Sequence, residues 1–109
     1  MKNTVDSQRF EVDLIELFLN EKREAGRHES TLERYAYLIK LIVSSIGKPI
    51  RYITDTDIRN YFSDRKNKGW SLSSVYSTCS VLVIFYDWVC KKGFVEVNPA
   101  SSVFLELGN

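Results

Sequence analysis

Residues 71–90 read SLSSVYSTCSVLVIFYDWVC and carry the strongest helical signal in the chain. Apolar side chains recur along this stretch every three or four residues, at Leu72, Val75, Cys79, Leu82, Phe85, Tyr86 and Val89. Three more apolar residues, Val81, Ile84 and Trp88, lie beside that stripe. A helix that is apolar over so much of its circumference either lies at the centre of a bundle or keeps one face for a partner.

The segments on either side of this stretch show the same helical period, and none shows the alternation typical of a half-buried strand. Upstream, apolar stripes predict helices over residues 7–25, 31–46 and 55–67. The stripe of the first comprises Phe10, Leu14, Leu17 and Phe18. Downstream, Asn98 before Pro99 predicts a short fifth helix that ends near Leu107. We therefore predict an all-α domain over residues 7–109, preceded by a flexible tail over residues 1–6.

Turn and capping residues separate the predicted helices. Gly26 and Gly47 suit the left-handed position that follows a helix. Ser30 with Glu33, and Thr54 with Asp57, have the spacing of a capping box, in which each side chain accepts from the other residue's amide. An extended bridge is expected over residues 50–53, and Ser71 is expected to cap the central helix.

Length and charge narrow the classes of protein that this chain could be. The chain has 109 residues and a formal net charge of +1, which indicates one domain without a strong overall field. Residues 30–92 nevertheless carry ten basic and five acidic groups, so the centre of the chain is positive. The longest apolar run has six residues, far fewer than a membrane span needs, and no secretory signal opens the chain. We expect a soluble cytoplasmic protein without a membrane partner.

The residues that usually form catalytic or metal sites do not converge in this sequence. Cys79 and Cys90 lie eleven positions apart in one predicted helix, too far apart to form a disulfide, and we expect both to be buried as apolar residues. His28 is the one histidine, so a transition-metal site would lack ligands. No nucleophile elbow, phosphate loop or HExxH motif is present. We therefore expect no cofactor, no metal and no enzymatic activity from this chain by itself.

Polar and basic residues gather at the starts of two predicted helices. Helix N-termini with free amides, hydroxyls and nearby cations are suitable phosphate sites. Each residue also has a structural explanation: Ser30 and Ser71 as caps, and Lys66 and Lys68 as partners of a helix dipole. The candidate DNA-binding residues are Arg27, Ser30, Thr31, Arg34, Lys40, Lys66, Lys68, Trp70, Ser71, Ser73, Ser74 and Ser77.

Several of these residues belong to an ordered set of short motifs. In chain order the motifs are Ser30-Thr31-(x)3-Tyr35-(x)2-Leu38, Ile53-Thr54-(x)2-Asp57-Ile58-(x)2-Tyr61, Ser71-(x)2-Ser74, Leu82-(x)2-Phe85-Tyr86-x-Trp88 and Asn98-Pro99-Ala100. Over roughly residues 8–102 this order resembles the N-terminal core-binding domain of tyrosine recombinases of the phage-integrase type. The resemblance implies an orthogonal four-helix SAM-like bundle with a short C-terminal fifth helix.

The resemblance also implies a function. Domains of this family clamp one side of the recombination-site duplex, while a separate C-terminal domain, absent from this chain, carries the nucleophilic tyrosine. The implied partners are double-stranded DNA, that catalytic domain and other recombinase protomers. The implied location is the cytoplasm, in association with the nucleoid, for a protein of bacterial or phage origin. Family contacts map onto Ser30, Thr31 and Arg34 in one helix, and onto Ser71, Ser73, Ser74 and Ser77 in another. Val83 and Ile84 stand where the family often has basic residues.

Two other functions are compatible with the pattern. In the first, a helical protein-interaction module would use Val81, Ile84 and Trp88 to meet a partner protein, and the basic centre would be incidental. In the second, a small regulator would bind DNA through a helix-turn-helix. The second is less consistent with the sequence, because no pair of short helices joined by a tight turn presents a basic recognition helix.

Overall fold

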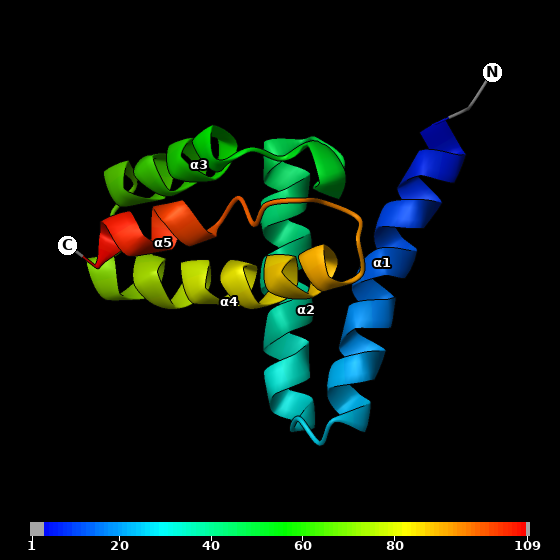
Figure 1. The fold of residues 1–109 in the computed structure, drawn as a ribbon. Helices are drawn as coiled ribbons and strands as arrows, with labels where there is room; N and C mark the ends of the chain where they lie inside the picture. Colours follow the sequence, from blue (N-terminus) through cyan, green and yellow to red (C-terminus); the bar gives the residue numbers. More distant parts are fainter. Residues whose placement is uncertain (1–3, 109) are drawn as a thin grey trace.

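The computed structural model describes residues 4–108, with side chains from residue 13 onward. Two long helices, α1 (Thr4–Glu24) and α2 (Glu29–Ile46), form an antiparallel pair. A 3-10 turn, η1 (Ile50–Tyr52), leads into α3 (Asp55–Asn67), followed by α4 (Leu72–Lys91) and the short α5 (Ser101–Leu107). In Figure 1, α4 crosses α2 instead of running along it, and α3 and α5 lie beside the first half of α4. Residues 4–108 contain no strand, which confirms the all-α prediction.

α4 is the central helix. Nine of its residues are buried, namely Val75, Thr78, Cys79, Val81, Leu82, Phe85, Tyr86, Trp88 and Val89. The interaction-module hypothesis requires Val81 and Trp88 at a surface that meets a partner. They are only 2% and 6% exposed, so these two residues do not form such a surface. In the described part of the chain, α4 is also the one helix with the length and apolar composition to cross a membrane. Half of that segment is buried inside the bundle, as in the core helix of a folded domain.

Aromatic side chains pack α1 against α4. The ring of Phe18, which is fully buried, meets Phe85 edge-on with centroids 5.1 Å apart, and Trp88 at 5.5 Å. Such edge-to-face pairs add to the stabilisation from burial. The predicted stripe of α1 is wrong at Leu17, which is 46% exposed, because the buried face turns toward Ile15 and Leu19. The side chain of Phe10 lies outside the described residues.

The start of α2 differs from its prediction. The helix begins at Glu29 with His28 as its N-cap, and no side chain caps it, so the predicted capping box at Ser30 is wrong. The cause lies in α1, because the Arg27 amide donates to the Lys22 carbonyl at 3.0 Å and turns the chain tightly. Arg23 then bonds both carboxylate oxygens of Glu29, at 3.1 and 3.0 Å, which draws Glu29 into the first turn.

Other boundaries shift for comparable reasons. α1 begins at Thr4, so residues 4–6 of the expected flexible tail are helical, while residues 1–3 lie outside the described residues. Ile50–Tyr52 forms η1 where an extended bridge was expected. α5 begins at Ser101, because Asn98 accepts from the Ala100 amide at 2.9 Å in a turn and does not cap the helix.

The starts of α3 and α4 confirm their predictions. Thr54 and Asp57 form the full capping box. Ser71 caps α4 by accepting from the Ser74 amide. Beside the start of α4, Arg59 of α3 bonds both carboxylate oxygens of Glu106 at 2.9 and 2.8 Å, which holds α5 against α3.

Candidate nucleic-acid interface

The turn between α3 and α4 presents an indole to one side of the bundle. Gly69 has φ +102°, a conformation that side-chain-bearing residues rarely adopt, and the Trp70 amide donates to the Arg65 carbonyl at 3.1 Å. The chain then enters α4 at Ser71. Trp70 is thereby fixed between two helices, with a half-buried ring that packs against the core.

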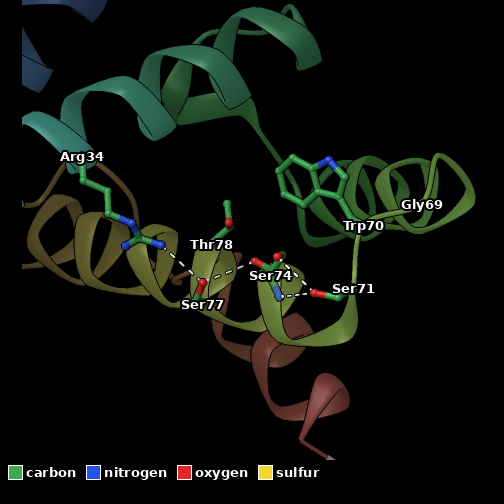
Figure 2. Close-up of a pocket in the computed structure, with 7 residues that line it drawn as sticks. All are labelled: Arg34, Gly69, Trp70, Ser71, Ser74, Ser77 and Thr78. Atoms are coloured by element: carbon green, nitrogen blue, oxygen red, sulfur yellow. Dashed lines mark hydrogen bonds between the residues drawn. The ribbon is translucent and has the colours of Figure 1, made fainter.

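A hollow of about 530 Å³ lies between the first half of α2 and the first half of α4, and we call it the α2–α4 hollow. Figure 2 shows Arg34 reaching across from α2 toward α4, with the Trp70 ring on the far side. The lining residues are Arg34, Gly69, Trp70, Ser71, Ser74, Ser77 and Thr78.

Arg34 is the cation of this hollow. Its Nη2 donates to the Ser77 hydroxyl oxygen at 3.3 Å, a contact that joins residues 43 positions apart. In the part of the chain with described side chains, residues 13–108, no carboxylate pairs with Arg34. A guanidinium that has only a hydroxyl partner keeps most of its donors for an external anion.

Serine hydroxyls line the α4 side of the hollow. The Ser71 hydroxyl donates to the Ser74 hydroxyl at 3.1 Å and accepts from the Ser74 amide at 3.1 Å. The Ser77 hydroxyl donates to the Ser74 carbonyl at 3.5 Å (Figure 2). All three serines are exposed, and they lie at the N-terminal end of α4, where the helix dipole favours negative charge.

Five of the twelve candidate residues therefore meet at one place: Arg34, Trp70, Ser71, Ser74 and Ser77. Four other candidates lie outside the hollow but close to the N-terminal ends of α2 and α4. Ser30 and Thr31 precede Arg34 on α2, with Ser30 bonded to His28 at 3.2 Å, and Arg27 lies in the turn before them. Ser73 is exposed in the first turn of α4.

The three lysine candidates lie elsewhere. Lys40 pairs with Glu16 of α1 at 3.4 Å, and Lys68 pairs with Asp64 at 3.3 Å. Hydrogen bonds from Arg65 and then Lys68 hold the pKa of Asp64 below its usual value, so this carboxylate stays charged and offsets Lys68. Lys66 lines a separate hollow of about 220 Å³ between α3 and α5.

Sequence reasoning missed two lining residues, Gly69 and Thr78. Gly69 has no side chain, so its residue type gives no signal of a binding role. Thr78 interrupts the apolar face of α4 with a polar side chain, and this interruption was the signal that could have identified it. Where side chains are described, from residue 13 to 108, no cluster of three or more potential metal-binding residues occurs.

Comparisons with known proteins identify the family. The family model described as "Phage integrase, N-terminal SAM-like domain" matches residues 14–95, which is well over half of the chain. Searches among curated proteins and among solved structures gave no match. The matched domain is the N-terminal part of a phage integrase and not its catalytic domain. The all-helical bundle and the family match agree, and the chain belongs to the phage integrase N-terminal SAM-like domain family.

Proposed function

We propose that this chain is the DNA-binding domain of a site-specific tyrosine recombinase, and that it clamps the core recombination site by seating a phosphodiester backbone in the α2–α4 hollow. One observation carries the proposal: Arg34 has no carboxylate partner in the described part of the chain, and it faces a row of serine hydroxyls at the start of α4. Guanidinium groups, hydroxyls and helix N-termini are the groups that bind DNA phosphates most often.

The proposal includes the partners of the domain. They are double-stranded DNA, the catalytic domain of the same recombinase and other recombinase protomers on the DNA. In this arrangement the domain positions the duplex and the catalytic domain cleaves it. The setting is the cytoplasm of a bacterium, whose chromosome or resident phage supplies the DNA.

The charges of the domain support weak, salt-sensitive binding. Arg27, Arg34 and Lys66 make no ion pair within residues 13–108, whereas Lys40 and Lys68 are compensated. If each of the three unpaired cations neutralises one phosphate, the logarithm of the binding constant falls with the logarithm of salt concentration at a slope of about −3. Serine hydroxyls position a protein on DNA more than they read bases, so we expect modest sequence preference.

An amide-resolved NMR titration with a short generic duplex tests this proposal, first at low salt and then at physiological salt. We expect shifts to concentrate in residues 27–37 and 66–78 and to fade with salt. Arg34→Ala is expected to weaken binding about tenfold, because it removes a charge-assisted contact. Lys40→Ala is the matched control, because it removes a cation of the same helix that Glu16 already pairs.

Two results would contradict the proposal. One is the absence of duplex-dependent shifts even at low salt. The other is a set of shifts that lies on α1, or that Lys40→Ala and Arg34→Ala reduce equally. Either result would mean that the hollow does not bind the duplex backbone.

A further inference from the structure

Within residues 13–108, Thr78 is the one buried residue that is not of an apolar or aromatic type. It is 5% exposed and lies on α4 among apolar residues, next to Cys79 and one turn after Val75, which are both fully buried. It also lines the α2–α4 hollow, and Figure 2 shows its side chain directed from α4 into that hollow, toward the side of α2.

The hydroxyl of Thr78 has no hydrogen-bond partner in the described part of the chain. Serine and threonine in a helix usually donate to a backbone carbonyl about one turn earlier. Two neighbours on α4 do so: Ser77 donates to the Ser74 carbonyl at 3.5 Å, and Ser80 donates to the Ser77 carbonyl at 2.6 Å. Thr78 makes no such bond, and its hydroxyl oxygen is not one of the buried unpaired atoms of the described residues, so it opens onto the hollow. An unpaired hydroxyl that opens onto the hollow is available to a ligand seated there.

The surroundings define the chemistry of that ligand. The Arg34 guanidinium stands on one side of the hollow, the serine hydroxyls stand on the other, and no carboxylate lines it. A hydroxyl that donates in this setting is complementary to an anionic oxygen. The Trp70 ring adds an apolar wall, and about 530 Å³ is enough space for a phosphodiester with its attached sugar.

We infer that Thr78 is a DNA-contacting residue at the floor of the α2–α4 hollow, where its hydroxyl donates to a non-bridging oxygen of the phosphodiester that Arg34 holds from the side. The inference rests on the proposed function and deepens it, since it names the group that determines how far the DNA backbone enters the α2–α4 hollow. Arg34 supplies charge at the side of the hollow, and Thr78 supplies a short-range contact that depends on a fully seated phosphate.

Two substitutions at one position test this inference. Thr78→Val keeps the shape of the side chain and removes the hydroxyl, while Thr78→Ser keeps the hydroxyl. Binding of a fluorescent duplex at low salt is measured by anisotropy. We expect Thr78→Val to weaken binding about five- to tenfold without changing the salt slope, because the lost group is uncharged. Thr78→Ser is expected to bind within about twofold of the parent chain. Thr56→Val, at an exposed position of α3, is the control.

Urea unfolding of the same variants separates a ligand contact from a structural one. If the hydroxyl is unpaired in the free domain, Thr78→Val unfolds at the same or a higher urea concentration than the parent chain while it binds more weakly. A loss of stability in Thr78→Val would show an internal hydrogen bond and would overturn the inference. Equal duplex binding by Thr78→Val and the parent chain, with Arg34→Ala still weakened, would overturn the inference and leave the proposed function intact. An absence of binding by the parent chain would overturn both.

Discussion

The hydroxyl of Tyr86, in the second half of α4, donates to the backbone carbonyl of Ile50 in η1 at 2.9 Å. Both residues are at most 1% exposed, so this contact lies in the core and joins residues 36 positions apart. It fixes η1 against α4 and thereby sets where α3 begins. A buried hydrogen bond of this kind stabilises the fold chiefly because either partner would be costly to leave unpaired.

Tyr86→Phe should therefore destabilise the domain. The substitution keeps the ring and removes the donor to the Ile50 carbonyl, and we expect the free energy of unfolding to fall by about 1–2 kcal/mol. Urea unfolding followed by tryptophan fluorescence measures the change. An unchanged unfolding midpoint would mean that the contact contributes nothing to stability.

Tyr61→Phe is the matched opposite case. Tyr61 is also buried, but its hydroxyl has no partner in the described part of the chain, and burial raises the pKa of the phenol. Removing an unpaired buried hydroxyl should leave the free energy of unfolding unchanged or raise it by about 1 kcal/mol. The Tyr61 ring under the Arg65 guanidinium, 5.2 Å from its centroid, is retained in this variant. A loss of stability like that of Tyr86→Phe would show that Tyr61 has a polar partner in solution.

Two serines that look alike in the sequence should respond differently to substitution by alanine. Ser71 accepts from the Ser74 amide at the start of α4, so Ser71→Ala should lower the free energy of unfolding by about 1 kcal/mol. Ser30 caps nothing, because His28 is the N-cap of α2, so Ser30→Ala should have an effect below about 0.5 kcal/mol. Thermal unfolding of both variants decides the matter, and equal losses would contradict the observed start of α2.

The same contrast shows how far sequence reasoning reaches. Helix periods and the caps at Thr54 and Ser71 are local, because each depends on residues within one or two turns, and these predictions are confirmed. The start of α2 depends on a bidentate contact between Arg23 and Glu29 across a turn, which no local pattern shows. The local rule at Ser30 therefore gave a wrong boundary.

In the candidate site, too, the local features could be predicted from the sequence and the tertiary ones could not. The clustering of serines at the start of one predicted helix made Ser71, Ser74 and Ser77 candidates, and the hollow contains all three. Whether a basic side chain is free of an ion pair depends on acidic side chains that are distant in the sequence. Glu16 of α1, for example, bonds Lys40, which lies 24 positions away. Thr78 required knowledge of the packing between α2 and α4, because burial and the lack of a partner are tertiary properties.

The two cysteines should differ in reactivity. Cys79 is fully buried, and burial raises the pKa of its thiol to about 12, so almost no thiolate forms near neutral pH. Cys90 is half-buried, and its pKa is raised by burial and by Asp87. We expect slow alkylation of Cys90 alone in the folded domain and of both thiols in denaturant, as mass spectrometry would report. Rapid alkylation of Cys79 in the folded domain would mean that α4 opens at its centre.

Lowering the pH should destabilise the contact between α1 and the end of α4, because it protonates Glu21. The carboxylate of this residue accepts from Lys92 Nζ at 2.8 Å and from Trp88 Nε1 at 3.1 Å. The hydrogen bond from Lys92, and then the one from Trp88, hold the Glu21 pKa below 4.5 in the folded domain. Because the folded pKa lies below the unfolded one, the stabilisation is fully present above about pH 4.5 and is lost as pH falls through the folded pKa.

Glu21→Gln isolates this contribution from that of the other carboxylates. The amide oxygen can still accept from Trp88, but the ion pair with Lys92 and the titration are removed. We expect Glu21→Gln to be less stable than the parent chain at neutral pH and to approach it in stability as pH falls below about 4. Glu24→Gln, at an exposed position of the same helix, should run parallel to the parent chain. Urea midpoints measured across this pH range give the comparison. A constant difference between Glu21→Gln and the parent chain would mean that the Glu21 pKa is the same in the folded and unfolded states, so that its contacts with α4 do not favour the charged form.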